Sequence, residues 1–124
     1  ALRARNIHPI LLASPTTPLD RIQLLATEGG GFLYYVSMTG VTGGAVSQQE
    51  SLSDRLTAVR AAAELPVAVG FGIRTPEDVA RLAPHTEAVV VGSALVRLVA
   101  THKADAAGPL RELTASLVAP LGSA

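Results

Sequence analysis

Four apolar, β-rich runs divide the chain, and each is followed by a segment in which apolar residues recur at helical spacing. The apolar runs cover residues 7–13, 32–37, 66–70 and 88–91. The helical patterns cover residues 19–28, about 53–64, a segment that opens at 76, 94–101 and about 109–118. Strands that alternate with helices pair in parallel, with right-handed crossovers between them. The sequence therefore predicts four βα units in one parallel sheet.

Residues that favour the beginning and the end of a helix flank the first helical pattern. Thr17 is the expected N-cap, with Pro18 at the first helical position, where its missing N–H does no harm. The three glycines at 29–31 end the same helix.

The next two helices also carry capping residues. Ser53 or Ser51 is expected to cap the second helix. Thr75 is expected to cap the third, with Pro76 at its first position and Asp78 at its third. A threonine followed three residues later by an acidic residue predicts a capping box.

Four βα units fit two architectures about equally well. One is a complete, small, doubly wound sheet, and the other is half of a (β/α)8 barrel, which needs about 250 residues. The chain has 124 residues, about half that number. Its strand runs are apolar on both faces, as buried parallel strands should be. No linker or boundary is visible, so we expect a single domain over residues 1–124.

Composition narrows the class of protein. Apolar residues make up 48% and charged residues 16%, and the formal net charge is zero. This suits a globular protein and offers no basic surface for nucleic acid or anionic lipid. The absence of cysteine excludes disulfides, thiolate catalysis and cysteine-ligated metals, and is compatible with a cytoplasmic protein. The chain shows no signal-peptide pattern. It opens at Ala1 and not at Met, so we expect its N-terminus to have been trimmed, processed or left out.

Glycine-rich spots follow three successive strands, at residues 40–44, 70–72 and 92–93. Ligands bind at the carboxyl ends of parallel strands, and glycine lets backbone N–H groups approach an anion. The short helix after the last spot aims its free N–H groups at the same place. We therefore predict a phosphate site made by Gly43, Gly72, Gly92 and Ser93.

Three further residues are candidates for the substrate pocket. Phe71 lies between two glycines at a strand end, where a ring would line a cavity. Strand alternation alone leaves open whether Tyr34 points into the pocket or packs in the core. Thr42 could hydrogen-bond across the mouth of the site or stabilise its own loop.

No group for acid–base catalysis is expected near this site. The ten carboxylates fall in helices, caps and connections rather than at strand ends. His8 lies within the first apolar run, and His85 and His102 lie near helix ends. None of them has a metal-ligand spacing, so no catalytic residue and no metal site is predicted.

Taken together, these stretches resemble the tryptophan synthase α chain family. The resemblance lies in ALRARNIHPILLASPTTPLDRI, GFLYYVSMTGVTGG, LPVAVGFGIRTPEDV and VVVGSALV, in the order and spacing of the family. It implies strands five to eight of a (β/α)8 barrel. It also implies a lyase that cleaves indole-3-glycerol phosphate by a retro-aldol reaction into indole and glyceraldehyde 3-phosphate. Indole would then pass to a β subunit that holds pyridoxal phosphate, and this chain would need no cofactor.

The resemblance also assigns site residues and shows two departures. Tyr34 and Phe71 would lie near the indole ring or glycerol chain, and Thr42 would be the threonine of the loop that closes over a catalytic aspartate. The phosphate set is the one predicted above: Gly43, Gly72, Gly92 and Ser93. Glu87 stands where the family has an aspartate–glycine turn. The family's catalytic glutamate and aspartate have no counterpart here, so we expect the chain to be inactive alone, and to pair with a missing N-terminal half or with itself.

Overall fold

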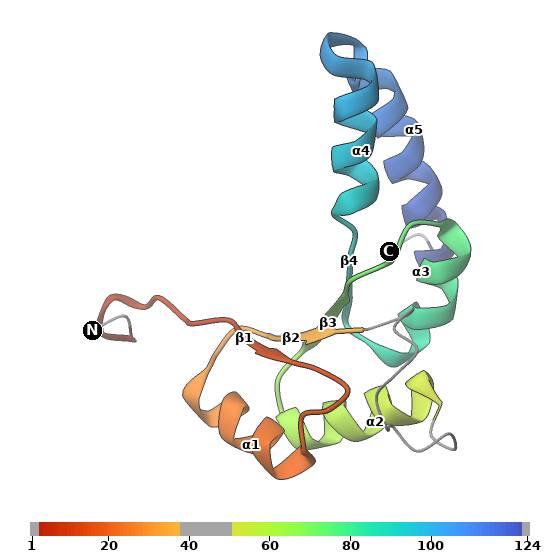
Figure 1. Ribbon diagram of the computed structural model, residues 1–124. Helices are drawn as coiled ribbons and strands as arrows, with labels where there is room; N and C mark the ends of the chain where they lie inside the picture. The colour runs from red at the N-terminus through yellow and green to blue at the C-terminus, as the bar shows by residue number, and fades with distance from the viewer. Residues whose placement is uncertain (1–2, 38–50, 123–124) are drawn as a thin grey trace.

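The computed structural model describes residues 3–37 and 51–122. Four strands form one parallel sheet in the order β1-β2-β3-β4 (Figure 1). The strands are β1 Leu11–Ala13, β2 Leu33–Val36, β3 Val67–Gly70 and β4 Ala88–Val90. The parallel pairing and the sequential order are as the alternating pattern predicts.

Five α-helices and four short 3-10 turns precede, connect or follow the strands in the described part of the chain. The α-helices are α1 Leu19–Glu28, α2 Leu52–Ala63, α3 Pro76–Leu82, α4 Ser93–His102 and α5 Ala107–Val118. The 3-10 turns are η1 Arg3–Arg5, η2 Ala83–His85, η3 Lys103–Asp105 and η4 Ala119–Leu121. The predicted helices are all present, and α1 has the predicted bounds.

Capping follows the prediction at α2 and α3. Ser51 is the N-cap of α2 and accepts a hydrogen bond from the Asp54 N–H. Thr75 and Asp78 form the complete capping box at the start of α3. Because each cap joins residues close in sequence, the local pattern is enough to predict it.

The prediction that Thr17 caps α1 is wrong. Pro18 occupies the N-cap position and makes no side-chain cap bond. The Thr17 hydroxyl instead accepts a hydrogen bond from the Ser14 N–H at 2.9 Å, and the Thr17 N–H donates to the Ser14 carbonyl at 3.0 Å. Thr17 therefore closes the turn that precedes the helix.

The first strand is shorter than predicted, so His8 lies before it and not within it. β1 begins at Leu11, opposite Leu33 of β2. Residues 7–10 pair with no strand in the part of the chain that the structure describes, and Pro9 has no N–H to donate to a ladder. The exposed His8 ring instead lies beside Gly30, whose added β-carbon would stand 2.5 Å from Nδ1.

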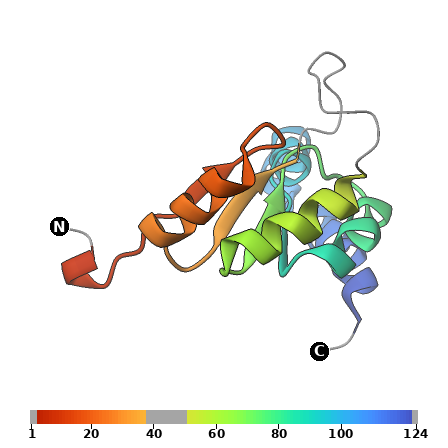
Figure 2. The same ribbon diagram turned by 90° about the horizontal axis from the view of Figure 1, so that it is seen from below.

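The hydrophobic core lies on one face of the sheet. Side chains that alternate along the strands point toward α1, α2 and α3, which cover this face (Figures 1 and 2). The core side chains fully buried here include Ile22, Leu33, Leu56, Val67 and Val69.

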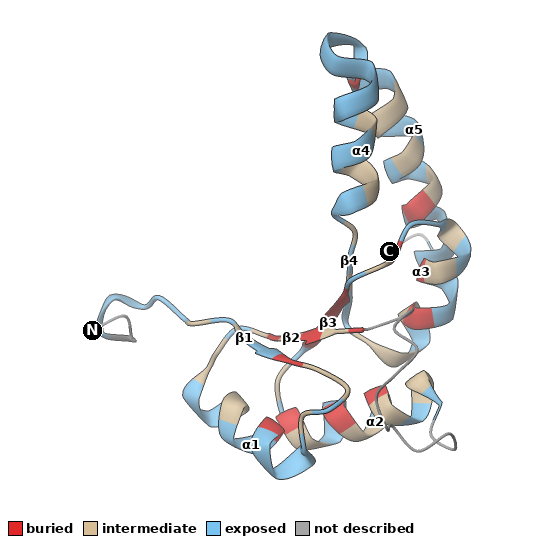
Figure 3. Cartoon of the chain, in the orientation of Figure 1, coloured by how far each residue is buried: buried red, intermediate tan, exposed pale blue. Residues whose placement is uncertain are grey.

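The opposite face of the sheet is more open at its edges. In Figure 3 β3 is buried along its length, whereas the edge strand β1 carries an exposed residue. Leu12 is 63% exposed and Val90 is 37% exposed, although Ala68 between them is buried. The expectation that every strand is buried on both faces is therefore wrong for the two edge strands. A doubly wound sheet would carry helices on both faces. The one-sided cover in the described residues instead fits part of a barrel.

The last two helices extend from the carboxyl end of β4. α4 and α5 lie side by side and project away from α1 and α2 (Figure 1). α5 packs against α3, and its Leu117 joins the core. The start of α4 is thereby held next to the carboxyl ends of the strands.

Candidate functional site

A pocket of about 430 Å3 opens where β3 and β4 end. Its lining comes from β2, the segment between β3 and α3, the end of β4 and the first turns of α4. The lining residues are Tyr34, Phe71, Gly72, Ile73, Arg74, Val90, Gly92, Ser93 and Arg97. Two other hollows, of about 340 and 430 Å3, lie between α2 and the end of α3 and at the amino ends of β3 and β4, away from the carboxyl ends of the strands.

The pocket brings together the predicted site residues that the structure describes. Tyr34, Phe71, Gly72, Gly92 and Ser93 all line it, although they come from three different strands and the segments after them. The other two predicted residues, Thr42 and Gly43, lie outside the described residues.

Tyr34 points away from the helix-covered core. Its neighbours along β2, Leu33 and Tyr35, are buried on the core face, whereas Tyr34 is half-buried and lines the pocket. Its ring extends over Gly70, the last residue of β3. The structure thus decides the alternative that strand alternation left open, in favour of the pocket.

The backbone turns sharply where β3 ends. Phe71 has φ of 92° and Gly72 has φ of 79°, in the left-handed region that favours glycine. A bulky residue in such a conformation carries strain, which tends to persist at functional sites. The Phe71 side chain is 58% exposed, so core packing does not explain its presence.

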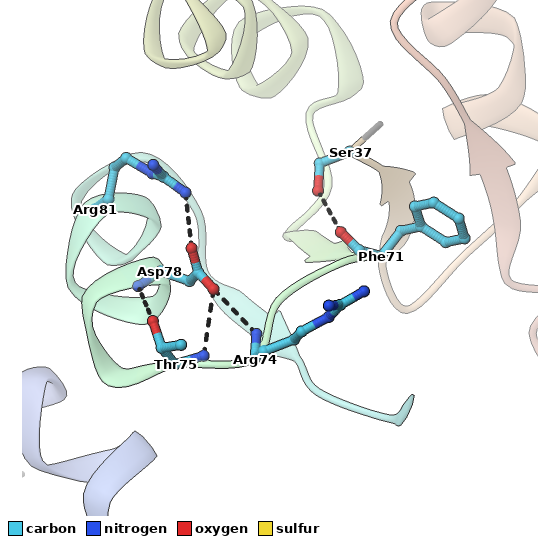
Figure 4. A network of polar contacts seen from close by, with 6 residues as sticks. All are labelled: Ser37, Phe71, Arg74, Thr75, Asp78 and Arg81. Carbon is cyan, nitrogen blue, oxygen red and sulfur yellow. Dashed lines mark hydrogen bonds and ion pairs between the residues drawn. The ribbon is translucent and has the colours of Figure 1, made fainter. Parts of the chain in front are cut away.

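Ser37, directly after β2, stabilises this turn by hydrogen bonds. Its side chain is buried, and its hydroxyl donates to the Phe71 carbonyl at 3.2 Å (Figure 4) and to the Gly70 carbonyl at 3.1 Å. Its N–H donates to the Gly70 carbonyl at 2.8 Å. The end of β2 therefore fixes the position from which Phe71 enters the pocket.

The start of α4 borders the pocket through Gly92 and Ser93. Gly92 is the N-cap, its carbonyl accepts from the Val96 N–H, and no side chain caps the helix. A β-carbon added at Gly92 would meet no atom within 4 Å. The N–H groups of the first helical turn have no partner within the helix, and the helix dipole places partial positive charge there. This geometry suits an anion.

Two arginines in the lining were not predicted. Arg74 follows Gly72 by two residues, and Arg97 follows Ser93 by four. Helical residues four apart share a face, so the position of Arg97 after Ser93 was a signal in the sequence. N–H groups alone can bind phosphate, so the predicted phosphate site did not require these cations.

The backbone of Arg74 is tied to the capping box of α3 (Figure 4). Its N–H donates to Asp78 Oδ2 at 3.1 Å, and the Thr75 N–H donates to the same oxygen at 3.2 Å. Arg81 forms an ion pair with the other oxygen at 2.9 Å. The hydrogen bond from Arg74 is the main cause that lowers the pKa of Asp78. Burial opposes it, and Thr75 and Arg81 lower the pKa further.

The family model of the tryptophan synthase alpha chain matches residues 1–120. The chain belongs to this family. A tryptophan synthase alpha chain from Novosphingobium aromaticivorans is 50% identical over the whole of this chain, which covers 47% of that relative. An alpha chain from Zymomonas mobilis is 39% identical, again over the whole of this chain and 46% of the relative.

Solved structures of the family share the fold. A tryptophan synthase α2β2 complex from Pyrococcus furiosus has a chain that superposes with a TM-score of 0.77 at 30% identity. The match covers 94% of this chain and 46% of that one. Tryptophan synthase from M. tuberculosis gives a TM-score of 0.75 at 28% identity, over 96% of this chain and 42% of that one.

The chain spans about half the length of the curated relatives it matches. The tryptophan synthase alpha chain family consists of TIM-barrel lyases of tryptophan biosynthesis. Its members need no cofactor, and pyridoxal phosphate belongs to the β subunit of tryptophan synthase. The four parallel βα units correspond to part of that barrel.

Among the described residues, no carboxylate and no histidine lines the strand-end pocket. No group of three or more potential metal ligands occurs in residues 3–37 and 51–122, and no helix there is long and apolar enough to cross a membrane. The N–H groups and arginines of the pocket suit an anion, and the rings of Tyr34 and Phe71 suit an aromatic or apolar group. Its described lining has no carboxylate or imidazole to transfer a proton.

Glu87, the departure from the family pattern, lies before β4, at the end of the sheet opposite the pocket. It accepts a hydrogen bond from the Val67 N–H at 2.8 Å and forms an ion pair with Arg60. Burial raises the pKa of Glu87, but the contacts with Val67 and Arg60 outweigh burial, so the pKa lies below its usual value. Glu87 thus joins β3, β4 and α2 and takes no part in the pocket.

Proposed function

We propose that residues 1–124 form a single unit, the phosphate-binding half of a tryptophan synthase α-type lyase. The reaction is the retro-aldol cleavage of indole-3-glycerol phosphate into indole and glyceraldehyde 3-phosphate. The observation that carries this proposal is the convergence of Gly72, Gly92 and Ser93 on one pocket at the strand ends.

The assignment to strands five to eight rests on the position of this pocket. Barrel enzymes often bind phosphate with the loops after strands seven and eight and with the N-terminus of a short extra helix. Here the glycines follow β3 and β4, and α4 is a helix inserted before α5. β3 and β4 then correspond to strands seven and eight.

The two ends of the pocket suit the two ends of the substrate. The N–H groups of Gly72, Gly92 and Ser93 would donate to phosphate oxygens, together with the Ser93 hydroxyl and Gly43. Tyr34 and Phe71 would contact the indole ring or the glycerol chain, and Thr42 would help to close the site.

We further propose that this chain binds substrate but does not cleave it alone. Holding the phosphate stabilises the ground state and the transition state equally, so it does not accelerate bond breaking. The reaction needs proton transfers at the indole and at the glycerol hydroxyl, each typically worth about 10²–10⁴-fold. The described lining contains no carboxylate for either transfer. A segment that carries the missing carboxylates, and a tryptophan synthase β subunit, would be the partners.

The open face of the sheet supports a second candidate, a non-catalytic module that associates with itself. The outer edges of β1 and β4 pair with no strand among the described residues, and Leu12 on β1 is 63% exposed. Exposed edges and apolar faces favour association. A stable homodimer in sedimentation equilibrium that binds glycerol 3-phosphate, and gives no activity with any complementing half, would support this candidate.

The experiment that tests the lyase proposal measures indole release from indole-3-glycerol phosphate. The purified chain is assayed alone and with the separately expressed N-terminal half of the Novosphingobium aromaticivorans relative. We expect no turnover by the chain alone and indole release by the mixture. Turnover by the chain alone would contradict the proposal that this chain binds the substrate while another segment supplies the catalytic carboxylates. An associated but inactive mixture would contradict the lyase proposal.

A further inference from the structure

Two arginines flank the strand-end pocket from different elements. Arg74 extends from the segment between β3 and α3, and Arg97 from the second turn of α4. In Figure 4 the Arg74 side chain leaves its backbone away from Asp78 and Arg81, on the side of Phe71. Both arginines line the pocket together with Gly72, Gly92 and Ser93.

Neither guanidinium group has an ion-pair or hydrogen-bond partner in the described residues. Other arginines do: Arg60 pairs with Glu87, Arg81 pairs with Asp78, and Arg55 donates to the Thr17 carbonyl. No carboxylate of residues 3–37 or 51–122 lines the pocket to offset the charges of Arg74 and Arg97. Two positive charges and the amino end of α4 therefore act on the same volume.

We propose that Arg74 and Arg97 form a charged clamp that makes this subsite select a dianionic phosphate monoester over a monoanionic diester. The proposal rests on the proposed phosphate site and assigns its selectivity to these two side chains. Backbone N–H groups bind the oxygens of either ligand, whereas two neighbouring cations favour the ligand with the second negative charge. The capping box supports the clamp by fixing the backbone of Arg74.

The test compares glycerol 3-phosphate with its methyl diester, by calorimetric titration of the full chain at several salt concentrations. Variants are Arg74→Gln, Arg97→Gln and the double variant. Arg111→Gln on α5 is the control, since it removes the same charge from an exposed site outside the pocket. Arg97→Lys keeps the charge and loses the planar fork.

We expect each pocket variant to weaken glycerol 3-phosphate binding by about three- to tenfold. The double variant should lose most of the preference for the monoester and most of the salt dependence. Arg97→Lys should retain the preference in part, and Arg111→Gln should behave as the unsubstituted chain. Circular dichroism checks that each variant keeps its fold.

Two outcomes would overturn the clamp and are distinguishable. If Arg74→Gln and Arg97→Gln match Arg111→Gln while Gly92→Val loses binding, the clamp is wrong and the phosphate site stands. If the unsubstituted chain binds neither ligand, the phosphate site and the clamp are both wrong.

Discussion

The hydroxyl end of Tyr34 lies directly over Gly70. A β-carbon added at Gly70 would stand 2.0 Å from Tyr34 Oη and 2.6 Å from Cζ, and 3.2 Å from Val90 Cβ. The last residue of β3 must therefore lack a side chain for the tyrosine of β2 to reach the pocket. Two neighbouring strands thus determine one wall of the site.

We predict that Gly70→Ala displaces Tyr34 and destabilises the chain by about 1–3 kcal/mol, because the added methyl group has no free space. Urea denaturation measures this change. In a Tyr34→Ala background the same substitution should cost clearly less, since the closest atoms are gone. Equal costs in the two backgrounds would contradict the contact.

Ser37 should act on the pocket through the turn at Phe71. We predict that Ser37→Ala destabilises the chain by about 1–2 kcal/mol, because a buried hydroxyl bond to the Gly70 and Phe71 carbonyls is lost. It should also weaken the binding of an indole-containing phosphate. Ser116→Ala is the matched control, since its hydroxyl donates to the Leu113 carbonyl within α5. If the two variants lower affinity equally, Ser37 has no positioning role.

Because the backbone at Phe71 is strained, replacing this residue by glycine should relieve strain but weaken ligand binding. With φ of 92° and a largely exposed ring, Phe71 loses little packing when it is replaced. Phe71→Gly should be more stable than Phe71→Ala by about 1 kcal/mol, because only glycine adopts this φ without strain. Both variants should bind an indole-containing ligand more weakly than the unsubstituted chain. A less stable glycine variant would show that the backbone at Phe71 is relaxed.

Because of Glu87, the free energy of unfolding should vary with pH in the acid range. Its pKa in the folded chain lies below the ordinary value of 4.5, so its contribution is complete well above that pH and is lost as the pH falls through the folded pKa. We predict that Glu87→Gln lowers the free energy of unfolding by up to about 1 kcal/mol at neutral pH and by little in strong acid. Glu112→Gln, an exposed change on α5, is the control. A cost for Glu87→Gln that does not change with pH would contradict this role.

Features that depend on neighbours in sequence could be predicted. The bounds of α1 and the capping box of Thr75 and Asp78 follow from periodicity and from side-chain to backbone bonds across three residues. The gathering of Gly72 and Gly92 at one end of the sheet could also be predicted, because the strands are parallel. The alternation of strand and helix patterns places each glycine just after a strand, and parallel pairing brings the carboxyl ends of the strands together.

Features that depend on packing across the sheet could not be predicted in the same way. The direction of Tyr34 follows from which face the helices cover, and the period-two pattern leaves that face undetermined. Thr17 had a competing partner in Ser14, which only the turn geometry reveals. Arg74 and Arg97 were missed because the direction of each side chain depends on tertiary placement. Arg74 lies just before α3 and Arg97 lies within α4, so their position at the pocket follows from how these two helices sit against the sheet.

The central claim is that the N–H groups of Gly72, Gly92 and Ser93 bind phosphate, and amide chemical shifts measure it most directly. Glycerol 3-phosphate is titrated into ¹⁵N-labelled chain and into Gly92→Val. This variant should keep its fold, because φ of −118° suits any residue and free space surrounds the glycine. We predict saturable shifts that are largest at these three amides, and affinity weakened more than about tenfold, or about 1.4 kcal/mol, in the variant. Absence of saturable shifts at these amides, or unchanged affinity in Gly92→Val, would contradict the claim.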